Sequence, residues 1–152
     1  MVTSGNKPSI LVKPTLDTKF YIDYSWWDRS TDDLRMYLLS HVLPEQRDRL
    51  INAEAGSVID YIDPETGEVF QLDELQLAIR QAAEDPNFIN PQTSLVDSVF
   101  RVFLANGNQP LSPRELAEAT GRSASTILKT FSGTRIYKGI RPYTPETASD
   151  DN

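Results

Sequence analysis

Apolar residues fall at helical spacing in two adjoining stretches near the end of the chain. In the first stretch, Leu116 and Ala117 share one face, while Glu115 and Glu118 face water. In the second, positions i, i+3, i+4 and i+7 are filled by Ala124, Ile127, Leu128 and Phe131. This pattern predicts two short helices, each with one buried face.

Capping residues indicate where these two helices begin and end. Ser112 precedes Pro113, and a serine N-cap before a proline in the first turn is a strong start signal. Gly121 lies where the chain must turn, which predicts a positive φ, and Ser123 is the expected N-cap of the second helix. Gly133 is expected to end that helix.

The two helices resemble the helix-turn-helix family and, more loosely, the winged-helix family. That pattern has a small residue, a glycine four residues on and a branched apolar residue six further on, which Ala117, Gly121 and Ile127 match. The resemblance implies that the second helix enters the DNA major groove with its N-terminal residues at base edges. The residues it places against DNA are Ser123, Ser125, Thr126, Lys129 and Thr130.

The sequence departs from the family pattern in two places. Thr130 stands where an aliphatic residue is usual, so the packing stripe shifts to Leu128 and Phe131. After Gly133 there is room for one extended run, 135–138, which we interpret as a stunted wing or a basic arm. The cations expected to hold phosphates are Arg122, Lys129, Arg135, Lys138 and Arg141. A helical hairpin used for protein contacts is the alternative to DNA binding.

An amphipathic helix precedes this motif and is the expected first helix of a three-helix winged-helix core. Thr93 or Ser94 is its expected N-cap, and residues 109–112 form a candidate short strand that pairs with the wing. Its apolar face holds Leu95, Val99, Phe100, Phe103 and Leu104. The domain that resembles DNA-binding proteins therefore begins near Pro91.

The front of the chain predicts a strand and two helices. Residues 20–24 are aromatic and β-branched, which favours a strand. The adjoining Trp26 and Trp27 either close a small core or offer a stacking platform for bases or a partner. Ser30 or Thr31 is expected to cap a helix that ends at Pro44, and a more polar helix follows over residues 44–53.

Two β-prone runs, 57–62 and 68–72, flank a D-P-x-x-G loop and predict a β-hairpin. The carboxylates around this loop lack the spacing of a calcium-binding loop, which favours a plain turn. Asp73 is expected to cap a further helix that runs to Glu84. Residues 87–91 are expected to be a linker.

The formal net charge of −7 is distributed unevenly. Residues 110–143 carry +4, residues 1–109 carry −8 and the tail from 144 carries −3. A basic segment at the motif and an acidic front are compatible with DNA binding, because the distribution of charge matters more than its sum.

The chain lacks the residues that several classes of chemistry require. The chain has no cysteine, which excludes disulfides and thiolate metal sites, and its one histidine, His41, cannot build a metal site alone. It has no glycine-rich phosphate loop and no G-x-S-x-G motif. No apolar run approaches the roughly 18 residues of a membrane span. We therefore expect a non-catalytic cytoplasmic protein with no cofactor and no metal.

The sequence predicts an α+β protein in four parts. These are a flexible lead-in (1–18), an acidic module with a β-hairpin and helices (19–90), a small winged-helix-like domain (91–143) and a disordered tail (144–152). The wider pattern, including YIDYSWW, LANGNQPLSP and RIYKGIRPY, resembles a group of uncharacterised bacterial proteins, which implies no activity.

The expected function is that of a transcriptional regulator that binds double-stranded DNA. The alternative is a protein–protein adaptor in a nucleic-acid-processing assembly. In either case the acidic module offers a surface for a protein partner or for a homodimer.

Overall fold

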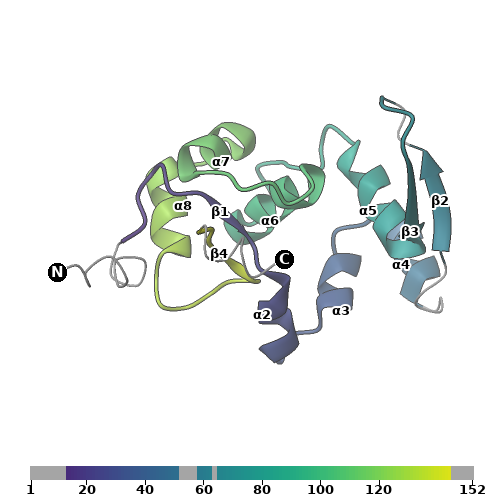
Figure 1. Ribbon diagram of the computed structural model, residues 1–152, viewed down its shortest axis with the longest axis horizontal. Helices are drawn as coiled ribbons and strands as arrows, with labels where there is room; N and C mark the ends of the chain where they lie inside the picture. Colours follow the sequence, from purple (N-terminus) through teal and green to yellow (C-terminus); the bar gives the residue numbers. More distant parts are fainter. Residues whose placement is uncertain (1–12, 52–57, 63–64, 145–152) are drawn as a thin grey trace. The chain divides into compact units, whose positions relative to one another are not determined.

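The computed structural model describes residues 13–51, 58–62 and 65–144. Over these ranges the chain is mostly helical, with seven helices and two separate two-stranded antiparallel sheets, and is α+β in a broad sense. It divides into two compact units (Figure 1). The terminal unit comprises the described residues of 1–28 and 89–152, and the central unit comprises those of 29–88. Residues 1–12 of the expected lead-in, and 145–152 of the expected disordered tail, lie outside the described residues.

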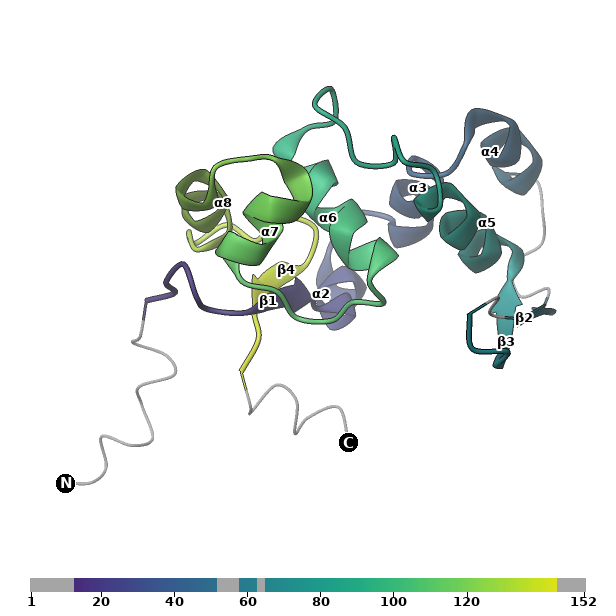
Figure 2. The same ribbon diagram turned by 90° about the horizontal axis from the view of Figure 1, so that it is seen from above.

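The sheet of the terminal unit joins the two ends of the described chain. Strand β1 (Phe20–Ile22) pairs antiparallel with β4 (Ile140–Pro142), and Ile22 lies opposite Ile140. Figures 1 and 2 both show these strands side by side. The other edge of β1 bonds to Leu111, whose carbonyl accepts from the Phe20 N–H at 2.8 Å and whose N–H donates to the Phe20 carbonyl at 3.0 Å. Strand β1 therefore lies between segments that follow it by about ninety and by more than a hundred residues in sequence.

Four helices surround this sheet: α2 (Tyr24–Arg29), α6 (Leu95–Ala105), α7 (Pro113–Thr120) and α8 (Ala124–Phe131). Trp27 is 5% exposed and contacts Phe100 edge-on, with 6.3 Å between ring centroids, which confirms a core role for that tryptophan. Trp26 is half-buried. The buried apolar residues of this unit include Phe20, Ile22, Trp27, Val99, Phe100, Phe103, Leu116, Ile127, Phe131 and Ile140.

The strand expected over 20–24 ends at Ile22, because Tyr24 already begins α2. The compact units also differ from the sequence division into 19–90 and 91–143. Residues 13–28 pack with the C-terminal part of the chain, because the backbone groups of β1 find their partners there. Such long-range pairing leaves no periodic signal in the sequence.

In the central unit, two short helices precede a hairpin and a longer helix. These elements are α3 (Leu34–Leu39), α4 (Pro44–Ile51), β2 (Val58–Ile62), β3 (Val69–Asp73) and α5 (Glu74–Ala83). The first helix is capped by Asp33, whose Oδ1 accepts from the Met36 N–H at 3.2 Å, and not by Ser30 or Thr31 as expected. The positive end of the helix dipole also stabilises a carboxylate at this position.

The predicted hairpin is confirmed, with Val58 opposite Asp73 and Ile62 opposite Val69. Residues 63 and 64 of its loop lie outside the described residues. Asp73 ends β3 and caps α5 through a capping box with Gln76, as the sequence predicts for the cap. The buried apolar residues of this unit include Leu39, Val42, Leu50, Leu75, Ala78, Ile79 and Ala82.

Candidate nucleic-acid interface

A capping box fixes the start of α7. The Glu115 N–H donates to Ser112 Oγ at 3.2 Å, and the Ser112 N–H donates to Glu115 Oε1 at 2.8 Å. Pro113 occupies the first turn, where its missing N–H costs no hydrogen bond. The predicted cap is therefore confirmed, and the first helix of the motif has a defined entry direction.

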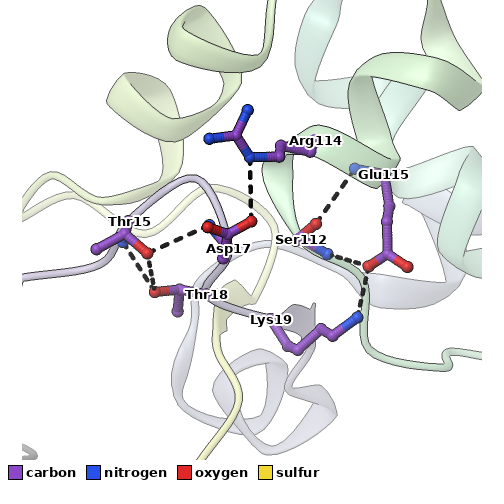
Figure 3. A network of polar contacts seen from close by, with 7 residues as sticks. All are labelled: Thr15, Asp17, Thr18, Lys19, Ser112, Arg114 and Glu115. Carbon is purple, nitrogen blue, oxygen red and sulfur yellow. Dashed lines mark hydrogen bonds and ion pairs between the residues drawn. The ribbon is translucent and has the colours of Figure 1, made fainter.

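The segment just before β1 is held against this helix start (Figure 3). Lys19 Nζ lies 2.6 Å from Glu115 Oε1, and Arg114 Nε lies 3.0 Å from Asp17 Oδ1. In the described end of the expected lead-in, the Thr18 N–H donates to the Thr15 carbonyl at 3.1 Å and closes a turn, from which Asp17 reaches Arg114. The hydrogen bond from Lys19, together with that from the Ser112 backbone, lowers the pKa of Glu115 below its ordinary value.

The turn between α7 and α8 has the predicted backbone. Gly121 has φ 73°, in the left-handed region that favours glycine, and its N–H donates to the Ala117 carbonyl at 2.8 Å. The guanidinium of Arg122 donates to the carbonyls of Thr93 and Pro91. Arg122 therefore ties this turn to the segment before α6, a structural role that the sequence did not indicate.

One face of α8 is packed into the terminal unit. Ile127 is 1% exposed and Phe131 4%, as their spacing predicts. Ser123 is the N-cap, and its side chain accepts from the Thr126 N–H at 3.3 Å. The helix ends at Phe131, and its C-cap is Ser132, one residue before Gly133.

The other face of α8 presents short polar groups. Ser125, Thr126 and Lys129 are exposed, and Thr130 is half-buried. The Thr130 hydroxyl donates to the Thr126 carbonyl at 2.8 Å, within the helix. Among the described residues, Lys129 forms no ion pair. The structure thus gathers four of the predicted DNA-facing residues on one short helix.

The basic segment after α8 is not an extended arm. Tyr137 and Ile140 pair across a tight turn in which Lys138 has φ 56° and Gly139 has φ 81°. The chain reverses there, so Arg135, Lys138 and Arg141 do not follow one another along a single extended run. The physical reason is a long-range contact: the Gly139 carbonyl accepts from the Asp23 N–H at 2.8 Å, which holds the turn against the start of α2.

The three cations of this segment have different surroundings. Arg135 is exposed, with its guanidinium carbon 5.0 Å from the centre of the Tyr137 ring. Lys138 Nζ lies 5.9 Å from the centre of the Trp27 ring. Arg141 Nη1 lies 3.2 Å from Asp23 Oδ2, an ion pair that partly neutralises it. Arg135 is thus the most accessible of the three.

The sequence did not indicate the ion pairs Lys19–Glu115, Arg114–Asp17 and Arg141–Asp23. Asp17, Asp23 and Glu115 each pair with a basic residue about 96 or more positions away. No local motif marks such pairs. The extended run was expected to end before Gly139, but the reversal of the chain at that glycine was not predicted.

Comparisons with known proteins return no match, whether to a protein-family model, to a curated protein or to a solved structure. Within the described ranges, no helix has the length and apolar character needed to cross a bilayer. The described residues also contain no group of three or more metal-ligating side chains.

Proposed function

We propose that the chain binds double-stranded DNA through α8. One observation carries the proposal: α8 buries Ile127 and Phe131 while its opposite face exposes Ser125, Thr126 and Lys129. Hydroxyl groups can accept from and donate to base edges, and a lysine can donate to the acceptors of guanine in the major groove. A helix of eight residues with this polarity has the form of a recognition helix.

The surrounding elements support a winged-helix-like arrangement. Helix α6 packs against α7, and α7 against α8, with the small sheet of β1 and β4 in the same unit. In this proposal the tight turn over residues 137–140 takes the place of the wing. The sheet differs from the predicted one, in which residues 109–112 pair with the wing. In the structure β4 pairs with β1, which comes from the other end of the chain, and Leu111 bonds to the other edge of β1.

The structure reduces the number of cations available for phosphates. Arg122 is bonded to backbone carbonyls and Arg141 to Asp23, whereas Lys129 and Arg135 are exposed. We therefore assign the main phosphate contacts to Lys129 and Arg135, and a third to Lys138. Three contacts correspond to a fall in log K with log salt of about 2.7.

The central unit gives the proposal a regulatory element. Residues 29–88 contain 5 basic and 13 acidic residues, a formal charge of −8, which exceeds the net charge of the whole chain. A charge of this sign opposes the field of DNA phosphates and favours release from non-specific sequence. A cytoplasmic transcriptional regulator without a catalytic step is the role that fits these features.

The decisive experiment separates phosphate contacts from base contacts. Fluorescence anisotropy with labelled random duplex DNA is measured from low to moderate salt on the wild type, Lys129→Ala and Ser125→Ala/Thr126→Ala. Lys129→Ala should weaken binding to every duplex and flatten the salt slope by about 0.9. The double variant should leave the slope unchanged and alter the sequence preference recovered by selection.

Arg49→Ala is the matched control, since Arg49 is an exposed cation on α4 of the central unit. If Arg49→Ala and Lys129→Ala weaken binding equally, attraction is diffuse and α8 is not the interface. Absence of any salt-sensitive binding to duplex DNA would contradict the proposal as a whole.

A second candidate is the protein–protein adaptor. An exposed apolar patch around Trp26, Trp27 and Leu128 would favour this function, but Trp27 is buried and the other two are half-buried. Exposed aliphatic residues are found instead in the central unit, where Ile62 and Val69 are 64% and 62% exposed. This observation favours a partner surface on the hairpin, in addition to DNA binding.

A further inference from the structure

Helix α6 ends in an asparagine that is followed directly by a glycine. Asn106 is the C-cap of α6, and Gly107 has φ 72°, in the left-handed region. The Asn108 N–H donates to the Phe103 carbonyl at 2.8 Å, which completes a left-handed ending common at helix C-termini. Residues 106–111, which lead from α6 to the N-cap of α7, are called the connector below.

The main-chain nitrogen of Gly107 is accessible. Gly107 is exposed, and nothing lies within 4 Å of the position that a Cβ would occupy. Among the described residues, no hydrogen-bond partner is found for its N–H. Glycine has no side chain to obstruct its nitrogen, so this atom can attack the side-chain carbonyl carbon of the preceding Asn106 and close a succinimide ring.

Two hydrogen bonds hold the Asn106 side chain away from this attack. Its Nδ2 donates to the Gln109 carbonyl at 3.1 Å, and its Oδ1 accepts from the Gln109 N–H at 3.0 Å. The main chain at Asn106 has ψ 11°, at which the ring cannot close, because the Cβ and the next nitrogen must first become eclipsed. Asn106 is therefore protected until the connector opens locally.

The reaction needs no co-reactant other than water. The Gly107 nitrogen gives its proton to a solvent base and bonds to Asn106 Cγ, while the bond from Cγ to Nδ2 breaks and Nδ2 leaves as ammonia with a proton from water. Water then opens the succinimide at one of its two carbonyl carbons. Attack at Cγ yields aspartate, and attack at the main-chain carbonyl carbon yields isoaspartate, in which the main chain runs through Cβ and Cγ.

Either product loosens the cover of β1. The connector bonds to β1 at two points: the Asn108 side-chain amide holds both backbone groups of Ile22, and Leu111 bonds to Phe20. Aspartate leaves the Gln109 carbonyl without its donor, which costs free energy. Isoaspartate adds a carbon to the main chain just before this contact and shifts Asn108 relative to Ile22.

We propose that Asn106 is a site of spontaneous deamidation that is protected while the connector is closed. Opening of the connector exposes the amide to Gly107, and the converted chain cannot restore both hydrogen bonds to Gln109. The terminal unit thereby records openings at the edge of β1 as a permanent change in charge and backbone. This inference does not depend on DNA binding.

The first measurement compares asparagines within the same protein. The full chain is incubated in warm, mildly alkaline buffer, folded or in denaturant, and peptide mass spectrometry follows deamidation at each position. Asn108 precedes glutamine and is the matched control, whereas Asn90 is the negative control, because Pro91 has no N–H with which to close the ring.

In denaturant, Asn106 should react at least about tenfold faster than Asn108, and folding should slow Asn106 by at least about tenfold without stopping it. No lead over Asn108 in denaturant would overturn the assignment of the site. Equal rates in the folded and unfolded chains would overturn the protection, and an Asn106 that never reacts in the folded chain would mean that the connector does not open.

Two variants separate opening of the connector from unfolding of the whole unit. Asn108→Ala removes the amide that holds Ile22 and leaves the Asn106–Gly107 sequence intact. Ile127→Ala is the matched control, since it removes a buried side chain of the same unit on α8. Circular dichroism establishes that each variant is folded during the incubation. Asn108→Ala should accelerate deamidation at least about fivefold more than Ile127→Ala does. Equal acceleration would overturn the role of the connector.

The last measurement asks whether the product loosens the unit. The converted protein is more acidic and is separated from the unconverted protein by ion exchange, and its urea midpoint should be lower. Asn106→Asp provides the aspartate product directly and should also have a lower midpoint. Asn106→Ser cannot deamidate, so its midpoint should stay constant through an incubation in which that of the wild type falls. An unchanged midpoint in the converted protein would overturn the proposal.

Discussion

The side-chain amide of Asn108 takes the place of a neighbouring strand beside Ile22. Its Oδ1 accepts from the Ile22 N–H at 2.8 Å, and its Nδ2 donates to the Ile22 carbonyl at 2.9 Å. Asn108 has φ 62°, a left-handed conformation that asparagine tolerates better than most residues. With the Leu111 backbone bonded to Phe20, this amide completes the edge of β1 that β4 does not cover.

Replacing Asn108 should loosen β1. Asn108→Ala leaves both half-buried backbone groups of Ile22 without their partner and places alanine in a left-handed conformation, at a cost of about 2–4 kcal/mol. Asn108→Gly removes the amide but tolerates the backbone, so it should cost less than alanine. Urea denaturation measures the difference, and wild-type stability in both variants would contradict this role.

The turn at Gly139 should be intolerant of any side chain. A Cβ there would lie 2.9 Å from the Asp23 carbonyl oxygen and 3.1 Å from Trp27 Nε1, at φ 81°. Gly121 is the matched control, since it has φ 73° but open space around the same position. Gly121→Ala should cost about 1–2 kcal/mol from backbone strain alone, and Gly139→Ala about 2–5 kcal/mol. Equal thermal shifts for both variants would mean that the close contact is relieved without cost.

Different residues of α8 should serve core packing and DNA binding. Ile127→Ala removes a side chain that is 1% exposed and should destabilise the protein by about 2–5 kcal/mol. Thr130→Ala removes a hydroxyl that bonds within its own helix, so stability should change little while DNA binding changes. Chemical denaturation and anisotropy measure the two effects. A silent Ile127→Ala together with an unfolded Thr130→Ala would mean that the helix is rotated.

Glu115 should make stability depend on pH in the acid range. Its pKa is lowered in the folded state, chiefly by the hydrogen bond from Lys19 and then by that from the Ser112 N–H. The stabilisation is therefore complete above the ordinary value of 4.5 and is lost as pH falls through the lowered folded value. Glu115→Gln should reduce stability at pH 7, and the difference from the wild type should disappear once the pH is below the lowered pKa of the folded state. Glu118→Gln, on the exposed side of α7, serves as the control, and urea midpoints from pH 7 to 3 give the comparison.

The terminal unit should need residues 13–28 in order to fold cooperatively. A fragment that begins at Pro91 lacks β1 and Trp27, so it should show no cooperative thermal transition. A chain in which a long flexible linker replaces residues 29–88 keeps both and should melt cooperatively. Freed of a formal charge of −8, that chain should also bind random duplex DNA more tightly than the full protein at low salt. A cooperative transition in the Pro91 fragment would mean that β1 is dispensable.

Local signals in the sequence predicted local structure well. The caps Ser112, Ser123 and Asp73, the left-handed Gly121 and the burial of Ile127 all follow from interactions within a few residues. The cap of α3 was placed wrongly because the four neighbouring polar residues of 30–33 offer similar oxygens. The structure favours Asp33 among them, where a side-chain bond to the Met36 N–H is made.

Long-range structure could not be predicted in the same way. The pairing of Ile22 with Ile140 and the ion pair of Asp23 with Arg141 each join residues 118 positions apart, and no periodicity marks either. These contacts decide which cations remain available for a ligand. The basic arm was therefore predicted as extended, whereas Gly139 bends it back on Asp23. The periodicity of α8 predicted which of its residues would be exposed. It could not predict that Arg122 and Arg141 have partners within the protein.

The position of β1 in its sheet also sets an order of events on the ribosome. Synthesis delivers β1 first, then every residue of the central unit, and only much later the strand that covers its edge. The central unit is continuous in sequence, so it can form its core while Phe20–Ile22 is still unpaired. For that interval the nascent chain carries an apolar strand with open hydrogen-bonding groups, the kind of segment that associates with other chains or with chaperones. Slower translation between residues 29 and 140 would lengthen that exposure.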